Sequence, residues 1–261
     1  MKRTLIQPDL TFFPELYHPI LESSRVFDSS CSREAKVYFI DKEGGLFLKT
    51  AAAGTLKDEA TMTAYFHSKG LSAQVLSYHS GEKDWLMTSA IPGEDCTHPI
   101  YLADPIRLCD TLAQQLRQLH ELDAGDCPVR DRNEVYLRTA LQGYRQGVYE
   151  ADLFRTHWEF ASKEEALEEV NRNGSYLRPD ALLHGDYCLP NIMLDNWRFS
   201  GFLDLGFGGI GDRHIDLLWG VWTLYFNLHT DRYRDRFLDA YGRDAVNMDC
   251  LRTAAAMEIF R

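Results

Sequence analysis

The first 90 residues have the apolar pattern of short strands, interrupted by one helical segment. The runs KVYFI and LFLK are rich in β-forming residues, and the sequence DKEGG between them is typical of a turn. The helical segment keeps its apolar residues on one face and is followed by Gly70, which favours helix termination. Pro92-Gly93 then interrupts the pattern. We predict a short broken helix, a hairpin, a helix and two further strands at 11–24, 36–49, 57–69, 73–79 and 84–90.

Beyond residue 94 the pattern becomes mainly helical. Residues 104–122 carry apolar side chains near helical spacing, and Pro105 suits the first turn of a helix. A compact region of strands and loops at 181–206 lies among the other predicted helices, which cover 133–151, 162–172, 214–228, 231–241 and 247–260. The chain is therefore expected to have an α+β fold, with a small β-rich domain at 1–90, a linker at 91–94 and a larger helical domain at 95–261.

The most informative stretch is HGDYCLPNIMLDNWRFSGFLDLG, residues 184–206. Residues 192–194 and 199–203 read as the two strands of a hairpin, with a turn between them. Asn191 lies just before the first strand and Asp204 just after the second. They are expected to face each other across roughly 5 Å at the open end of the hairpin. An amide oxygen and a carboxylate so placed predict a Mg²⁺ site, which substrate phosphates commonly complete.

Asp186 precedes Asn191 by five residues, in the loop that enters the hairpin. Its position suits a base that accepts a proton from a hydroxyl nucleophile. Taken singly, each of these side chains could be an ordinary turn or cap residue; their combination and spacing favour a functional site. His184 follows an apolar run and is interpreted as a buried structural residue, and Cys188 as a packing residue.

A second pair of candidates lies in the β-rich domain. Lys49 ends the strand LFLK, and Glu59 shares a helical face with Met62 and Phe66. An acid on an inward face needs a partner, and Lys49 is a plausible one. A buried lysine held by a glutamate is suited to neutralising nucleotide phosphates. The alternative is a surface ion pair, since Lys57 and Asp58 offer other partners.

Composition and charge exclude some classes of protein. The net charge is −11, which disfavours a nucleic-acid binder. Residues 95–261 carry 18 basic and 27 acidic side chains. This excess of negative charge could attract a cationic ligand, or it could serve only to keep the protein soluble. No apolar run approaches the roughly 20 residues of a membrane span, and the N-terminus is a poor signal peptide. Six scattered cysteines without a CxxC pair favour reduced thiols and a cytoplasmic location.

Three motifs, HGDYCLPN, GFLDLG and GDRHID, resemble those of the aminoglycoside phosphotransferase family. HGD-x4-N is similar to the HRD-x4-N catalytic loop of protein kinases, and DLG to their DFG. The string at 184–206 resembles the 3′-phosphotransferase branch in particular. The resemblance implies a protein-kinase-like, two-lobed fold with a nucleotide-binding lobe at 1–90, a hinge at 91–94 and a catalytic and substrate-binding lobe at 95–261.

The resemblance also implies roles for individual residues. Asp186 would be the catalytic base, Asn191 and Asp204 would bind Mg²⁺, and Asp216 would hold the catalytic loop. Ser29 to Ser32 would lie in a loop over the phosphates. The cofactor-binding residues implied are Lys49 at the α- and β-phosphates, Glu59 anchoring Lys49, Ser32, the gatekeeper-like Met87, and Ser89, Ala90 and Ile91 in the hinge.

The implied reaction transfers the γ-phosphoryl group of ATP, or of GTP, to a hydroxyl of a cationic aminoglycoside. Glu258, Glu150 and Asp152 are the candidate acids for binding that substrate. The sequence departs from the family pattern at Phe207, where arginine is usual, at Met257, where aspartate is expected, and at the cation Arg261. We expect these changes to weaken the binding of an ammonium-rich substrate severalfold.

Two alternatives stay open at this point. The chain could phosphorylate another hydroxylated metabolite or antibiotic, or it could bind a nucleotide without turnover, although the complete catalytic set argues against the latter. No nucleic-acid or membrane partner is expected, and the protein could be a monomer or a homodimer.

Overall fold

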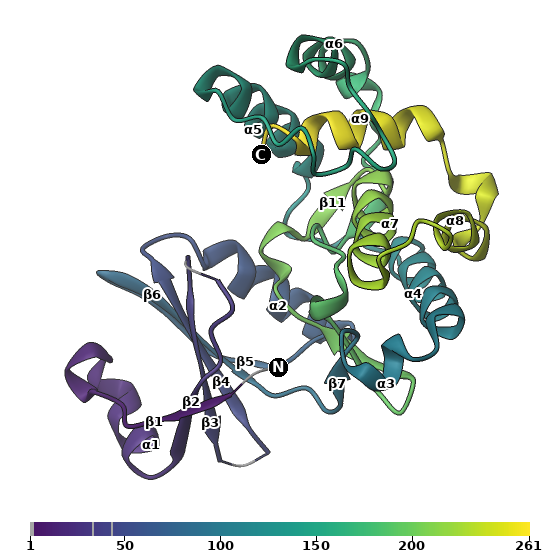
Figure 1. Ribbon diagram of the computed structural model, residues 1–261. Helices are drawn as coiled ribbons and strands as arrows, with labels where there is room; N and C mark the ends of the chain where they lie inside the picture. The colour runs from purple at the N-terminus through teal and green to yellow at the C-terminus, as the bar shows by residue number, and fades with distance from the viewer. Residues whose placement is uncertain (1–2, 33, 43) are drawn as a thin grey trace. The chain divides into compact units, whose positions relative to one another are not determined.

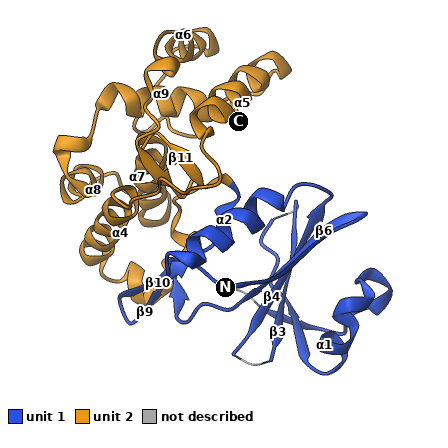
Figure 2. Cartoon of the chain, turned by 180° about the vertical axis from the view of Figure 1, so that it is seen from behind, with its two compact units in different colours: residues 1–95, 193–206 blue, residues 96–192, 207–261 orange. Residues whose placement is uncertain are grey.

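The computed structural model describes residues 3–32, 34–42 and 44–261. The chain divides into two compact units (Figure 2). The first comprises residues 1–95 and 193–206, and the second residues 96–192 and 207–261. The first unit thus includes residues 91–94, which were expected to form the linker, and also the segment 193–206.

The first unit is built on a six-stranded antiparallel sheet with strand order β1-β2-β3-β4-β6-β5 (Figure 1). The predicted hairpin and the two later strands are confirmed. The two strands that begin the sheet were not predicted, because they have only three and four residues and the first is largely exposed. The strands are β1 Thr4–Ile6, β2 Arg25–Asp28, β3 Lys36–Asp41, β4 Leu46–Ala52, β5 Val75–Ser80 and β6 Lys83–Ser89.

Helical segments supply apolar side chains to separate clusters on this sheet. Two short 3₁₀ turns, Leu10–Phe12 and Glu15–Tyr17, and helix α1 (His18–Glu22) belong to the predicted broken helix, and Tyr17 packs with Trp85 of β6. Helix α2 (Lys57–Ser68) packs through Ala60 against Leu86, in a different cluster. Since neighbouring residues of a strand point to opposite faces, the Trp85–Leu86 pair places the two clusters on opposite sides of the sheet.

The hairpin predicted after residue 191 is present. Strands β9 (Ile192–Asp195) and β10 (Arg198–Phe202) join β7 (Glu94–Asp95) in a three-stranded sheet of order β10-β9-β7. The two turn residues, Asn196 and Trp197, both have positive φ, of 49° and 68°. Positive φ at both central positions is the requirement of the tight turn that matches strand twist.

The second unit is mainly helical and contains a two-stranded antiparallel sheet of β8 and β11. The predicted helices are confirmed with small shifts of their ends, but the helix expected at 133–151 stops at Gln146. Gly147 has φ +81° and its left-handed conformation ends the helix. The elements are α3 Pro99–Leu102, α4 Pro105–His120, α5 Arg132–Gln146, α6 Lys163–Asn173, β8 Ala181–Leu183, β11 Gly209–Gly211, α7 His214–Leu228, α8 Arg234–Tyr241 and α9 Met248–Glu258.

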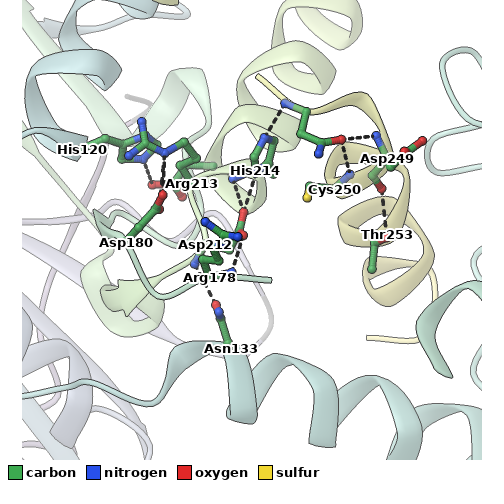
Figure 3. Close-up of polar contacts among 12 residues, drawn as sticks. His120, Asn133, Arg178, Asp180, Asp212, Arg213, His214, Asp249, Cys250 and Thr253 are labelled. Carbon is green, nitrogen blue, oxygen red and sulfur yellow. Dashed lines mark hydrogen bonds and ion pairs between the residues drawn. The ribbon is translucent and has the colours of Figure 1, made fainter. Parts of the chain in front are cut away.

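A polar network joins three of these helices (Figure 3). The Asp212 amide donates to Oδ1 of Asn133 on α5 at 2.7 Å, and the Asp212 carboxylate lies 2.6 Å from Nδ1 of His214. Nε2 of His214 in turn accepts the backbone N–H of Asn247 at 2.8 Å. Asn247 caps the first turn of α9 through its side-chain oxygen. The network therefore fixes where α9 begins relative to α5 and α7.

None of the helices that the structure describes is both long and apolar enough to cross a membrane.

Candidate active site

Three charged side chains of the first unit meet at one point. Nζ of Lys49, on β4, donates to both carboxylate oxygens of Glu59 on α2, at 2.9 and 2.8 Å. The same nitrogen lies 2.6 Å from Oδ1 of Asp204, two residues after the end of β10. The sequence predicted the pairing with Glu59; the additional pairing with Asp204 is a finding of the structure.

The two carboxylates keep Lys49 protonated. Burial alone would lower the pKa of the Lys49 ammonium group, but the negative charges of Asp204 and Glu59 outweigh it and raise that pKa. A permanently charged ammonium group in a partly dry site is suited to bind phosphate oxygens.

Asp204 has the properties of a ligand residue. It adopts a left-handed backbone conformation with φ +54°, which is uncommon for a residue other than glycine. Its side chain is about half exposed, at 55%. Lys49 engages one carboxylate oxygen, and the second is bonded to no group in the described part of the chain. That oxygen is available to a cation.

The second unit holds the predicted base and its neighbour. Nδ2 of Asn191 donates to Oδ2 of Asp186 at 2.8 Å and to the Asp186 backbone oxygen at 3.1 Å. These bonds orient the Asp186 carboxylate and commit the nitrogen of Asn191. The amide oxygen of Asn191 remains for a hard cation such as Mg²⁺.

The loop before Asp186 is held by one buried acid. Asp216, on α7, accepts the backbone N–H of His184 at 2.7 Å and that of Gly185 at 2.8 Å. His120 contacts the same carboxylate at 3.2 Å, and His184 is fully buried, with Nδ1 accepting the Asp186 amide. These contacts agree with the structural roles expected for Asp216 and His184.

Gly185 lies directly against the backbone of Phe207. It has φ +84°, and a Cβ atom there would lie only 2.1 Å from the backbone oxygen of Phe207. The hydroxyl of Tyr136, on α5, donates to the Gly185 carbonyl at 2.7 Å. Only glycine fits this position, because both the conformation and the space exclude a side chain.

A cavity of about 210 Å³ lies within the first unit. Of the expected hinge residues, Ile91 lines this cavity, whereas the Ala90 amide donates to the Gly45 carbonyl. The gatekeeper-like Met87 is buried in the sheet core. Ser89 is the last residue of β6 and pairs with Leu46 of β4. The cavity is lined by Arg3, Phe47, Ile91, Gly93, Glu94, Met193 and Leu203. Arg3 and Met193 were not anticipated, since both are far from the hinge in sequence.

The expected phosphate-covering loop connects β2 and β3. Ser32 is exposed in it, and its hydroxyl accepts the Ala35 amide at 3.4 Å. Arg33 lies outside the described residues.

The acids expected to bind the substrate have different surroundings. Glu150 and Asp152 are exposed, and the Glu150 amide donates to the Ile259 carbonyl at 2.7 Å, which ties this loop to the end of α9. The side chain of Glu258, by contrast, is only 4% exposed and is bonded to Arg261. Met257 is fully buried in the core, which explains an apolar residue there.

Another cluster has the residue types of a metal site. Ligand atoms of Asp212, His214 and Cys250 lie within 4.8 Å of one another. Both ring nitrogens of His214 are used by Asp212 and Asn247, and burial raises the pKa of the Cys250 thiol to about 11. We interpret the cluster as part of the structural network of Figure 3.

The sequence profile of the phosphotransferase enzyme family matches residues 27–253. The chain belongs to this family. It is therefore a kinase-type enzyme, and the expected family is confirmed.

This phosphotransferase resembles named relatives over nearly its whole length. A probable aminoglycoside 3′-phosphotransferase of Lactococcus lactis is 48% identical over 249 residues, which cover 95% of each chain. An aminoglycoside 3′-phosphotransferase of Niallia circulans is 28% identical over 86% of this chain and 87% of that one.

Solved structures show the same fold. A crystal structure of an aminoglycoside-3′-phosphotransferase of type VIII matches 89% of this phosphotransferase and 92% of that chain, with a TM-score of 0.70 and 28% identity. An aminoglycoside phosphotransferase from Streptomyces rimosus matches 97% and 98%, with a TM-score of 0.74 and 21% identity. The expected α+β, protein-kinase-like fold is thereby confirmed.

Sequence reasoning missed the surroundings of Glu258 in this phosphotransferase. Trp219 of α7 donates its indole N–H to Oε1 of Glu258 at 3.1 Å, and Tyr136 of α5 lies against Arg261. The available signal was the unusual cation Arg261, which lies only three residues after Glu258 in the sequence.

Proposed function

We propose that this protein is an aminoglycoside 3′-phosphotransferase, which transfers the γ-phosphoryl group of ATP to a hydroxyl of an aminoglycoside antibiotic and so confers resistance. The observation that carries the proposal is the 48% identity to the Lactococcus lactis relative across 95% of both chains. The paired side chains of both units supply the chemistry that such an enzyme needs.

Asp186 is the base of the reaction. The acceptor oxygen bonds to the γ-phosphorus as the bond between that phosphorus and the bridging oxygen of ADP breaks, and the hydroxyl proton passes to the Asp186 carboxylate. Asn191 orients that carboxylate through its 2.8 Å hydrogen bond. Positioning and charge neutralisation account for most of the catalysis of phosphoryl transfer.

The nucleotide is bound by groups of the first unit. Lys49 neutralises the α- and β-phosphates, and Glu59 holds its ammonium group in position. The loop with Ser32 covers the phosphates. The cavity beside Ile91 takes the purine. Met87 and Ser89 belong to β6, the strand that leads to this cavity, and Ala90 directly follows that strand. We propose ATP as the phosphoryl donor; GTP would use the same phosphate contacts.

Asn191 and Asp204 would hold the magnesium ion that accompanies the nucleotide. Each has a hard oxygen that the described protein groups leave available, which fits the ligand preference of Mg²⁺. Bound there, the ion would neutralise charge on the phosphate oxygens. We place the enzyme in the cytoplasm, where its nucleotide is made.

Steady-state turnover tests the function directly. ADP release should rise with added kanamycin or neomycin, and the product should carry phosphate on the 3′-oxygen by NMR. Tobramycin, which lacks a 3′-hydroxyl, is the matched control acceptor and should not be turned over. Cells that express the chain should gain kanamycin resistance, and cells that express Asp186→Asn should not. Turnover of none of the aminoglycosides would contradict the proposal.

One observation favours a second acceptor class. The Glu258 carboxylate is already paired with Arg261, so this acid does not demand a cationic acceptor. If a panel of hydroxylated metabolites supported turnover and aminoglycosides did not, the enzyme would be a small-molecule kinase of another specificity.

A further inference from the structure

The carboxylate at the end of α9 already has a cation. Nη1 of Arg261 donates to Oε1 of Glu258 at 2.6 Å, and Trp219 donates to the same oxygen. The side chains of Glu258 and Arg261 are 4% and 15% exposed. Water therefore screens this pair little, and the two charges hold each other strongly.

Aromatic rings fix the guanidinium group of Arg261. Its central carbon lies 3.9 Å from the ring centroid of Tyr136 and 5.1 Å from that of Phe207. A guanidinium group over a ring is a favourable contact, and it is stronger when water is excluded. The rings of Tyr136 and Phe207 therefore hold the Arg261 guanidinium group in this position.

This ion pair lies beside the catalytic loop. Tyr136 contacts Arg261 and also donates its hydroxyl to the carbonyl of Gly185, the residue before Asp186. Burial raises the pKa of the Glu258 carboxyl, and among the smaller causes the Asp186 charge raises it further. The two contacts of Tyr136 bring Arg261, and with it Glu258, into the neighbourhood of the base, where the acceptor must place its hydroxyl.

The arginine is not fully satisfied where it lies. Nε of Arg261 is buried and has no hydrogen-bond partner in the described part of the chain. A guanidinium group that only stabilises the fold would normally donate two parallel hydrogen bonds to a carboxylate. The position of Arg261 near the catalytic loop therefore favours a role in recognising the acceptor.

We propose that Arg261 is a specificity-determining residue of the acceptor site. Its guanidinium group occupies the Glu258 carboxylate and so takes the place that an ammonium group of the acceptor could otherwise fill. The inference rests on the proposed function and refines it: the enzyme selects aminoglycosides whose binding depends on ammonium groups elsewhere, such as those near the exposed Glu150 and Asp152.

The test compares acceptor affinity in four proteins by isothermal titration calorimetry with neomycin, together with kcat and KM where there is turnover. They are the native chain, Arg261→Met, Glu258→Gln and the double variant. Methionine keeps an unbranched side chain against the Tyr136 and Phe207 rings while removing the charge. We expect Arg261→Met to bind neomycin about tenfold more tightly, because a charge-assisted hydrogen bond to Glu258 becomes available. The gain should vanish in the double variant, which lacks the carboxylate.

Arg243→Met is the matched control, because it removes the same charge from an exposed pair with Asp239 in the same unit. It should leave neomycin affinity unchanged. An equal gain in Arg243→Met, or a gain that persists in the double variant, would mean a general charge effect and overturn the proposal. Weaker neomycin binding by an Arg261→Met protein that keeps its native melting temperature would also overturn it.

Arg261→Lys covers the case in which the methionine variant does not fold. Lysine keeps the charge but loses the planar group that lies over the Tyr136 and Phe207 rings. It should therefore hold Glu258 less firmly and give a smaller gain in affinity, whereas unchanged or weaker binding would count against the proposal. Calorimetry separates the two proposals. Binding without turnover would defeat the proposed function and still test Arg261, and no neomycin binding by any variant would defeat the role of Arg261.

Discussion

Lys49 presents its ammonium nitrogen to both carboxylate oxygens of Glu59, at 2.9 and 2.8 Å. The pair joins strand β4 to helix α2. It also holds the ammonium group of Lys49 in one position, whereas a free lysine side chain would move through a wide volume. Fixing it matters because ordering a free lysine on binding costs about 1.5–2 kcal/mol in lost rotamer freedom.

Replacing Glu59 by glutamine should therefore weaken nucleotide binding. Loss of a hydrogen bond between two charged groups corresponds to about a 10- to 100-fold rise in the KM for ATP. Initial rates at varied ATP, with saturating kanamycin, provide the measurement. Glu82→Gln, an exposed acid of the same unit, is the control and should keep the native KM. A native KM in Glu59→Gln would remove Glu59 from the phosphate site.

Replacing Asp186 by asparagine should stop turnover without loss of the nucleotide. General-base catalysis contributes about 10²- to 10⁴-fold, so kcat should fall by at least about 100-fold. Nucleotide affinity, measured by calorimetry with a nonhydrolysable ATP analogue, should stay within a factor of two or three of the native value. Asp195→Asn, at the exposed end of β9, should retain full kcat. Residual turnover near the native rate would exclude Asp186 as the base.

Two glycines with similar φ angles, one in the catalytic loop and one outside it, allow a matched test of that loop. Gly185 and Gly147 have φ of +84° and +81°, but only at Gly185 would a Cβ atom meet another group, the Phe207 oxygen. Gly147→Ala should lose about 1–2 kcal/mol of unfolding free energy through backbone strain alone. Gly185→Ala should lose more, and its kcat should fall because the loop must move.

Urea unfolding and steady-state kinetics on both variants measure these effects. Equal losses of stability and unchanged kcat in both would show that the loop tolerates displacement at Gly185.

The network of Figure 3 predicts how stability depends on pH. Burial alone would raise the pKa of Asp212, but hydrogen bonds from His214 and the backbone outweigh it and lower that pKa below its ordinary value of 3.8. The charged carboxylate therefore stabilises the fold fully above pH 3.8. This contribution is lost as the pH falls through the lower pKa of the folded state.

Asp212→Asn should therefore be less stable than the native chain by about 1–3 kcal/mol at pH 7. The difference should shrink as the pH falls below about 3.8. Urea unfolding at a series of pH values measures it, with the exposed Asp231→Asn as a control that should differ little at any pH. A difference that is independent of pH would mean that the charge of Asp212 does not contribute.

Local sequence determined the elements that depend on neighbouring residues. The apolar spacing predicted α4 and α7, and the turn sequence at 195–198 predicted the hairpin of β9 and β10, whose strands begin and end within a residue or two of the expected positions. The spacing of Asp186 and Asn191 identified two groups that are hydrogen-bonded in the structure. Such patterns can be recognised because a helix or a hairpin is stabilised by contacts over a few residues.

Tertiary structure decided the features that depend on distant residues. The short strands β1, at the edge of the sheet, and β2, beside it, have little apolar pattern of their own and are ordered by the strands next to them. Asp204 lies 155 residues from Lys49 in sequence, and nothing in the local pattern predicts that their atoms meet. The sequence offered Glu258 as a substrate-binding acid, but its burial beside Trp219 and Arg261 is seen only in the structure. Burial and charge pairing arise from contacts between segments that are far apart in the chain, and local sequence does not encode those contacts individually.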